Sequence, residues 1–383
     1  CLPGRLAAWP AGGLTGCLAA IMTSSAYITH VLDPLIDPQH AEQDLRFEKA
    51  FGSGDDQIQR DYVRGFKRVS TYAIDWAGDK LILATKDSHL RLLDPTTGEE
   101  ERSWPGEWMS AQADHNNPFV VAAVSWHGKF RIFDVREHTK TVIDCDLKKT
   151  QSSMKDFLVL SWSPDSKSIA INNRSDHIYI FDLRSSPLQL SGSRDMKQEV
   201  NQMVWSTDGE SLWVATGGTP GKIHVCPTPA LAAENTAAVV AHQHTAIALA
   251  ADPSGKYIAS SGGDCLVTLW DPKHLTCVRT FGYATQAVTT VGFNRSGSLL
   301  AWGTGGPGST GGEKNLTIVG SETGTLYWQD STPAPVQLVK WHPTRHILAY
   351  TLNVNQLPEE RDRRGGSGRD SAMVHLLKVP ESL

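Results

Sequence analysis

The chain has 383 residues, of which 40% are hydrophobic and 20% are charged, and its formal net charge at pH 7 is −5. This composition is typical of a globular protein with a sizeable core and excludes a disordered chain. The acidic balance also argues against a strongly basic nucleic-acid-binding protein.

Two further features narrow the class of protein. The six cysteines form no Cys-x-x-Cys pair, which disfavours zinc fingers and thioredoxin-like redox sites. No apolar run approaches the roughly 18 residues that a membrane-spanning helix needs. We therefore expect an intracellular protein without a metal or cofactor, without a small-molecule substrate and without a membrane partner.

The N-terminal region is expected to lie outside the fold. Residues 1–21 precede Met22 and include a short apolar stretch that weakly resembles a targeting segment, but we interpret them as an extension that is not part of the native protein. We expect residues 1–35 to be disordered or non-native, and residues 36–60 to form a helical or irregular lead-in.

From residue 61 onward the chain repeats itself. A short apolar strand that ends at an equivalent position occurs seven times, at intervals of 40, 48, 45, 44, 49 and 58 residues. The seven end positions are Asp94, Asp134, Asp182, Pro227, Asp271, Gly320 and Lys378. Repeats with a period of about 40–45 residues are typical of a β-propeller.

Each repeat also contains an upstream strand, a polar turn and a second apolar strand, as in "IALAADPSGKYIASS" at 247–261. Alternating patterns without a long helical segment predict strands almost throughout. Blades of this kind bury their faces against each other in a closed ring. We therefore predict an all-β, seven-bladed propeller that forms one closed domain over residues 61–383, with the outer strand of the seventh blade near 61–66.

The fifth repeat contains the residue types of a hydrolase triad. His242 enters the repeat, Ser260 lies on its second strand, Asp264 follows in the next turn and Trp270 lies on the third strand. This spacing predicts a buried relay from Asp to His, from His to the Ser hydroxyl and from Ser to the indole N–H. A triad would need an exposed nucleophile and an oxyanion site. We interpret the four residues as structural and expect no enzymatic activity.

Two long insertions interrupt the sixth and seventh repeats, at 303–314 and 358–370. Both join a second strand to a third strand, so we expect them to emerge side by side on one face, where loops on a rigid scaffold bind partners. The second contains an Arg-Gly-Gly step, but its arginines are balanced by acidic residues, which favours a solvated loop over a nucleic-acid site. The candidate docking residues are Lys314, Arg361, Arg363, Arg364 and Arg369.

The repeats resemble WD40 repeats, because Trp270-Asp271 is the dipeptide that gives the family its name and Ala241-His242 stands where the family often has Gly-His. The order of the divergent repeats over residues 60–383 resembles the WD40 subunits of the THO complex, an mRNA-export assembly. This resemblance is carried by stretches such as "HQHTAIALAADPSGKYIASSGGDCLVTLWDPKHLTCVRTF" and "VKWHPTRHILAYTL". Pro227 and Gly320 depart from the pattern.

The resemblance implies a non-enzymatic nuclear scaffold of the THO/TREX assembly, which couples transcription to mRNA processing and export. Its partners would be other THO/TREX subunits, and its contact with RNA would be indirect. An alternative is a substrate receptor of a cullin–RING ubiquitin ligase, because WD40 receptors of that kind dock their adaptor through Trp-Asp-x-Arg. Two segments of this chain match this motif with Phe in place of Trp, Asp134 to Arg136 and Asp182 to Arg184. The simpler interpretation is that each Arg pairs with its own blade-edge carboxylate.

Overall fold

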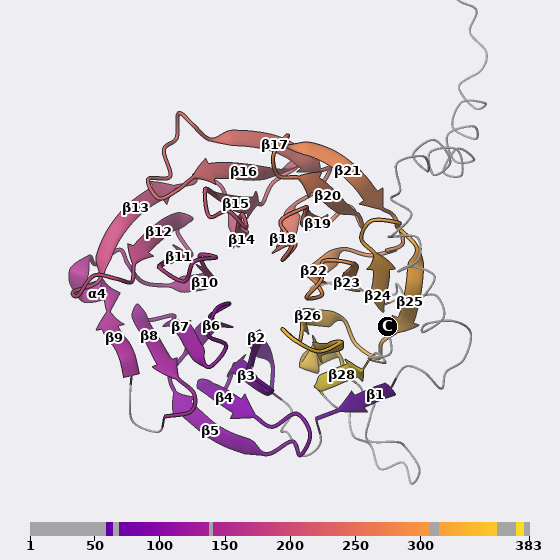
Figure 1. The fold of residues 1–383 in the computed structure, drawn as a ribbon, viewed down its shortest axis with the longest axis horizontal. Coiled ribbons are helices and arrows are strands. Elements are labelled where there is room, and N and C mark those ends of the chain that lie inside the picture. Colours follow the sequence, from indigo (N-terminus) through magenta and orange to yellow (C-terminus); the bar gives the residue numbers. More distant parts are fainter. Residues whose placement is uncertain (1–58, 64–68, 138–140, 306–313, 358–372, 379–383) are drawn as a thin grey trace, which may run out of the picture.

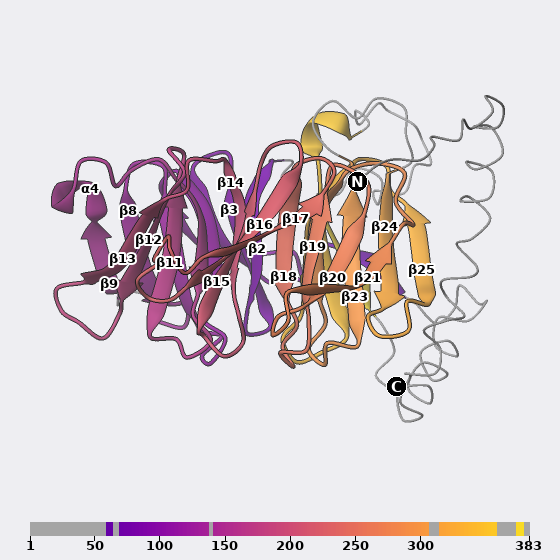
Figure 2. The same cartoon turned by 90° about the horizontal axis from the view of Figure 1, so that it is seen from above.

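The computed structural model describes residues 59–63, 69–137, 141–305, 314–357 and 373–378. These residues form seven four-stranded antiparallel sheets, arranged as blades around a central axis (Figure 1). The prediction of an all-β, seven-bladed propeller is thereby confirmed. Seen from the side, the ring is a flat disc whose strands run between its two faces (Figure 2).

The strands follow the blades in chain order, from the inner strand to the outer strand. The first two blades contain β2 (Thr71–Ala77), β3 (Lys80–Thr85), β4 (His89–Leu93), β5 (Glu100–Pro105), β6 (Trp108–Ala113), β7 (Val120–Ser125), β8 (Lys129–Asp134) and β9 (Thr141–Asp146). The third and fourth contain β10 (Phe157–Trp162), β11 (Ser168–Asn173), β12 (His177–Asp182), β13 (Gln189–Asp195), β14 (Val200–Trp205), β15 (Ser211–Thr216), β16 (Gly221–Pro227) and β17 (Ala237–His242). The fifth and sixth contain β18 (Ala246–Ala251), β19 (Ile258–Gly262), β20 (Val267–Asp271), β21 (Thr276–Phe281), β22 (Val288–Phe293), β23 (Leu299–Thr304), β24 (Asn315–Gly320) and β25 (Leu326–Ser331).

The seventh blade joins the two ends of the propeller. Its strands are β26 (Val336–Trp341), β27 (Ile347–Leu352), β28 (Val374–Lys378) and, at the outer edge, β1 (Gln59–Tyr62). β1 pairs antiparallel with β28, and the Val63 amide donates to the Val374 carbonyl at 3.0 Å. The outer strand thus begins two residues before the expected 61–66, and residues 64–68 lie outside the described part of the chain. Residues 1–58, which include the expected N-terminal extension and most of the lead-in, also lie outside it.

The antiparallel order of the strands defines two faces of the disc. Face A carries the turns between the first and second strands and between the third and fourth strands of each blade. Face B carries the turns between the second and third strands, together with the connections from one blade to the next. The short helices α4 (Leu147–Thr150) and η2 (Val354–Gln356) lie on face B, at the upper edge of the disc in Figure 2.

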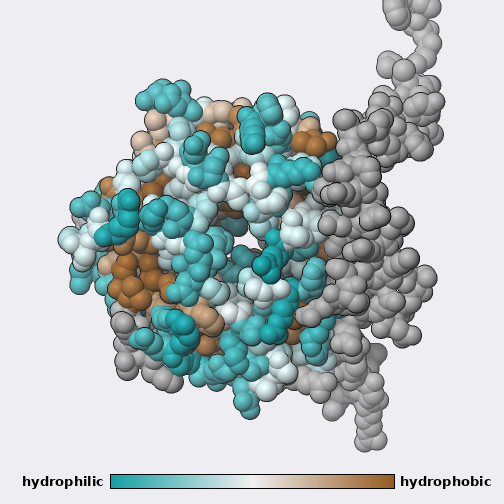
Figure 3. All heavy atoms as spheres, viewed as in Figure 1, coloured by the Kyte–Doolittle hydropathy of each residue, from teal (hydrophilic) through white to brown (hydrophobic). Residues whose placement is uncertain are grey.

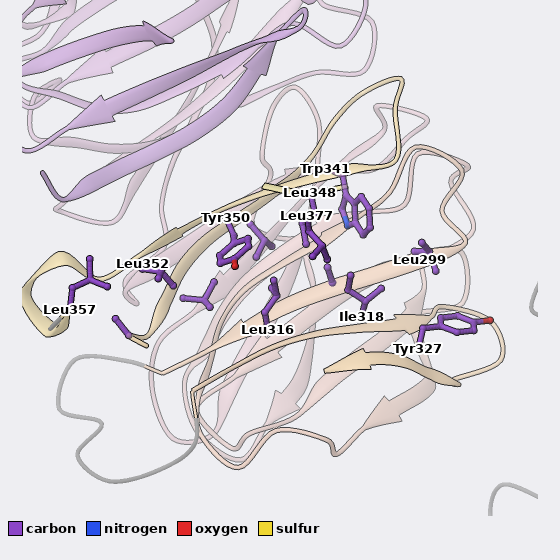
Figure 4. Packing of buried hydrophobic residues seen from close by; sticks show 14 residues of the cluster. Leu299, Leu316, Ile318, Tyr327, Trp341, Leu348, Tyr350, Leu352, Leu357 and Leu377 are labelled. Carbon is purple, nitrogen blue, oxygen red and sulfur yellow. The ribbon is translucent and has the colours of Figure 1, made fainter. Parts of the chain in front are cut away.

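The hydrophobic core is divided among the spaces between neighbouring blades. Figure 4 shows one of these spaces, where Leu316 and Ile318 of β24 pack with Trp341, Leu348 and their neighbours from the seventh blade. The space between the seventh and first blades is filled in the same way. Each blade therefore supplies one half of two cores, and no blade can bury its apolar faces alone.

The inner strands face the central axis with a free edge, whose polar backbone groups need partners. Four tryptophans, each the last or next-to-last residue of an inner strand, donate their indole N–H to a carbonyl of the preceding blade at 2.9–3.1 Å. These residues are Trp76, Trp162, Trp205 and Trp341. Side chains also accept backbone N–H groups across blades, as Asp75 does from Ala113 at 3.1 Å. The inner edges are thus hydrogen-bonded from blade to blade.

Candidate functional site

The structure brings together the four residues of the predicted relay, and it does so across two blades. His242 is the last residue of β17 in the fourth blade, not a residue of the loop that enters the fifth, whereas the other three belong to the fifth blade. The Nδ1 atom of His242 lies 2.9 Å from Oδ1 of Asp264, and its Nε2 atom lies 2.8 Å from Oγ of Ser260. The indole N–H of Trp270 donates to the same Ser260 oxygen at 2.9 Å. Gly262 lies against the relay, because a Cβ atom there would lie 2.6 Å from His242 Cγ and 2.8 Å from Asp264 Oδ1.

The direction of the hydrogen bonds follows from what each group can donate. The indole is a donor only and the carboxylate is an acceptor, so the neutral imidazole of His242 carries its proton on Nδ1 and accepts the Ser260 hydroxyl proton on Nε2. Burial lowers the pKa of His242, and the nearby Asp264 opposes this only in part. Since Ser260 is fully buried, no substrate reaches its hydroxyl. This arrangement stabilises the blade and offers no nucleophile.

The two Asp-x-Arg segments have the same geometry on face A of neighbouring blades. The guanidinium of Arg136 donates to both carboxylate oxygens of Asp134 at 2.9 and 2.6 Å. Arg184 makes the same pair of contacts with Asp182, at the same distances. The hydrogen bonds from Arg184 lower the pKa of Asp182 to about 2. Both arginine side chains are more than half exposed.

Apolar side chains lie on the outer strands that follow the two Asp-x-Arg segments. Val142 of β9 is 56% exposed and Leu190 of β13 is 43% exposed. Leu183 and Leu188, from the turn between β12 and β13, are partly buried against the hydrophobic core between the second and third blades. Figure 3 shows a hydrophobic area at the left of the disc, over the second and third blades. The second and third blades therefore combine exposed arginines with apolar surface.

The two long insertions leave the sixth and seventh blades on face B. The first starts after Gly305 and ends at Lys314, whose carbonyl accepts the Thr332 amide at 2.7 Å. The second follows Leu357 and ends at Met373, whose carbonyl accepts the Leu352 amide at 3.0 Å. Lys314 is half-buried. The other candidate docking residues, Arg361, Arg363, Arg364 and Arg369, lie outside the described residues.

Among the residues that the structure describes, no three His, Cys, Asp or Glu side chains are grouped so that they could hold a metal ion. Within the same residues, no helix has the length and apolar character needed to cross a membrane.

One contact between the first and last blades has no counterpart in the sequence-based predictions. His342 follows β26, and its Nε2 atom lies 3.2 Å from Oδ1 of Asp79 in the first blade. Arg345 donates to the other oxygen of Asp79 at 3.1 Å, and the Trp76 ring meets the His342 ring edge-on at 4.5 Å. The repeated tryptophan at the end of four inner strands was the available signal, because it marks the positions where blades are joined.

Comparison with known proteins agrees with this architecture. Residues 235–271 match the family model described as "WD domain, G-beta repeat". The β-propeller domain of Myceliophteria_thermophila Cps50 (Swd1) has a similar fold, with a TM-score of 0.64 at 14% identity, over 84% of this chain and 100% of that one. The protein is a seven-bladed β-propeller, and one stretch of it matches a WD40 repeat.

The comparison also points to a particular relative. The chain is 27% identical over 299 residues to THO complex subunit 3 of Arabidopsis thaliana, which covers 76% of this chain and 88% of that protein. It is 24% identical over 214 residues to WD repeat-containing protein AAC3 of Dictyostelium discoideum, covering 54% of this chain and 42% of that protein.

Proposed function

We propose that this protein is a non-enzymatic scaffold subunit of the THO/TREX assembly, which acts in the nucleus to couple transcription to mRNA processing and export. The observation that carries this proposal is the extent of the similarity to THO complex subunit 3, which covers 88% of that relative. A single shared repeat would indicate only a propeller, because the fold hosts many functions. Similarity along nearly the whole relative supports a shared set of partner surfaces.

The chemistry of the ring agrees with a scaffold. Among the described residues, the cluster that resembles a catalytic triad is buried, and the indole N–H of Trp270 donates to its serine hydroxyl oxygen. The rigid ring instead presents its turns and insertions to other proteins, and the partners in this proposal are other subunits of THO/TREX. The proposed docking platform is face B of the sixth and seventh blades, where Lys314 and Met373 mark the ends of the two insertions.

Affinity purification from nuclear extract tests the proposal. The full chain should co-purify other THO subunits, and a variant without residues 358–370 should retain its thermal unfolding midpoint but recover fewer of them. A purification without any THO subunit would contradict membership of the assembly. Normal recovery with the deleted variant would contradict the docking platform alone, because the rest of the ring is unchanged in that variant.

Docking to the adaptor of a cullin–RING ligase is a second candidate function. The pairing of each arginine with its own carboxylate is the simpler interpretation of these segments. The docking function is favoured by the exposure of both guanidinium groups in neighbouring blades, next to exposed apolar side chains. Replacing both Arg136 and Arg184 by Ala should abolish recovery of a cullin adaptor and leave recovery of THO subunits unchanged. If no adaptor co-purifies with the unmodified chain, this second candidate is excluded.

A further inference from the structure

A group of basic side chains lies on face B of the second and third blades. All of them are exposed, and none makes an ion pair with a carboxylate in the part of the chain that the structure describes. The members of this basic surface are Lys129, Lys148, Lys149, Lys155 and Arg174. They come from the first residue of β8, from the connection between β9 and β10 and from the turn after β11.

Backbone hydrogen bonds hold these three segments together. The Leu147 amide donates to the Gly128 carbonyl at 2.9 Å, and the Asp156 amide donates to the Trp126 carbonyl at 2.7 Å. The Arg174 amide in turn donates to the Asp156 carbonyl at 2.8 Å. The five cations are therefore carried by one connected patch of backbone.

The patch has an excess of positive charge. Three carboxylates in or beside the patch already have a partner. Glu107 pairs with His127, Asp144 pairs with Arg131, and Asp176 accepts the Val200 amide. Of these three, only Asp144 is neutralised, by Arg131, because a backbone amide leaves the charge of Asp176 unchanged and His127 is charged only when protonated. Asp146 and Asp156 also remain, and both are half-buried. The five unpaired cations therefore outnumber the remaining carboxylates, Glu107, Asp176, Asp146 and Asp156, by one, on a chain whose overall net charge is −5. Such a local excess attracts an anionic partner.

An aromatic ring lies within the same patch. Trp126 is partly exposed, and the guanidinium carbon of Arg174 lies 5.8 Å from the centre of its ring. Surfaces that bind single-stranded nucleic acid combine cations that follow the backbone with aromatic or guanidinium planes on which bases stack. An acidic peptide would use the cations but has no bases to stack.

We propose that this basic surface, with Trp126 at its centre, binds single-stranded nucleic acid. The lysines contact successive phosphates as point charges, and Trp126 and Arg174 provide the stacking plane. This is a direct contact, in place of the indirect contact with RNA that the resemblance to THO subunits implies. It does not depend on membership of THO, because every residue in the argument belongs to this chain.

The test measures binding of the full chain to a fluorescent oligouridylate of about twenty nucleotides by anisotropy. With three or four phosphate contacts, the affinity should fall about 20- to 50-fold between 50 and 200 mM salt. Replacing both Lys149 and Lys155 by Glu should weaken binding about tenfold or more. The matched control replaces Lys273 and Arg295, two exposed cations of face A, by Glu and changes the net charge equally; it should bind within about twofold of the unmodified chain.

The stacking plane has its own test. Trp126→Leu should weaken binding about tenfold, whereas Trp126→Phe should retain most of it, because the aromatic plane remains. Thermal unfolding of each variant identifies any loss that is due to misfolding. Equal losses in the two charge-reversed variants, or no binding at 50 mM salt, would overturn the proposal. Equally tight binding of polyglutamate of the same length would also overturn it, because the occupant would then be an acidic protein segment.

Discussion

The Nε2 atom of His342 in the seventh blade lies 3.2 Å from the Oδ1 atom of Asp79 in the first blade. The ring is therefore closed on face A by a side-chain contact, in addition to the pairing of β1 with β28. His342 is 2% exposed, and Arg345 approaches the other oxygen of Asp79. The junction between the first and last blades thus contains a buried imidazole.

This imidazole makes the stability of the ring depend on pH. Burial lowers the pKa of His342 in the folded protein, with Asp79 opposing the effect, while the unfolded chain titrates near the ordinary value of about 6.5. Below that pH the unfolded state binds more protons than the folded state, so the stability present above it is lost as pH falls. His342→Asn should lower the free energy of unfolding at pH 7 and flatten its decline between pH 7 and 5. Denaturant unfolding at several pH values measures both, and His244→Asn, at an exposed position between β17 and β18, is the control.

The relay of the fifth blade should be sensitive to loss of one hydroxyl. Ser260→Ala leaves the Trp270 indole N–H and the His242 Nε2 atom without their partner in a buried site. We expect the free energy of unfolding to fall by about 1–3 kcal/mol. Ser296→Ala, in an exposed turn, should change it by less than about 0.5 kcal/mol. Equal stability of these two variants would show that the relay does not stabilise the blade.

The hydrogen bonds that tryptophans make between blades can be tested by comparison with a blade that has phenylalanine at the same position. Trp162 donates to the Gln112 carbonyl at 2.9 Å, whereas the sixth blade has Phe293 at the equivalent last position of its inner strand. Trp162→Phe should keep an aromatic ring but lose the hydrogen bond, at a cost of about 1–2 kcal/mol. Phe293→Leu serves as the comparison, since it changes packing without removing a hydrogen bond. Urea unfolding gives the difference in free energy of unfolding between the two variants, provided that the slopes are unchanged. An unchanged midpoint for Trp162→Phe would show that the hydrogen bond of Trp162 does not stabilise the fold.

The outer strand of the seventh blade should depend on the backbone hydrogen bond at its end. Val63 is 3% exposed, and its amide donates to the Val374 carbonyl. Val63→Pro removes this donor and should destabilise the fold by about 3 kcal/mol or more. Val63→Ala keeps the donor and should cost only about 1–2 kcal/mol. The two thermal unfolding midpoints separate the backbone effect from packing, and identical midpoints would contradict it.

Much of the architecture is predictable because repetition is visible in the sequence. Seven strand ends at a period of about 40–45 residues predict the number of blades, and alternating apolar residues predict the strands. The spacing of His242, Ser260 and Trp270 could be interpreted because the outer strand of one blade leads directly into the next blade, so these positions are close in the sequence as well as in space. Local sequence patterns were therefore sufficient to predict the fold and the relay.

Features that need distant segments to meet were not predictable in this way. The contact of His342 with Asp79 joins the first and last blades, and no local spacing relates the two positions. The basic surface is hidden for the same reason, since Lys129, Lys155 and Arg174 belong to three separate segments. Whether a lysine is unpaired depends on which carboxylates the fold places beside it, and an overall net charge of −5 conceals a local excess of the opposite sign.

The pairing of β1 with β28 also determines the order in which the molecule can be completed. During synthesis β1 is made before any other strand of the propeller, yet its partner β28 is the last to emerge. Six blades can form while the chain is still growing, but the seventh cannot, and its unpaired edge stays exposed until translation has passed Lys378. A chain truncated before β28 retains six complete sheets and an open ring. This protein therefore becomes a closed ring only after β28 has been made.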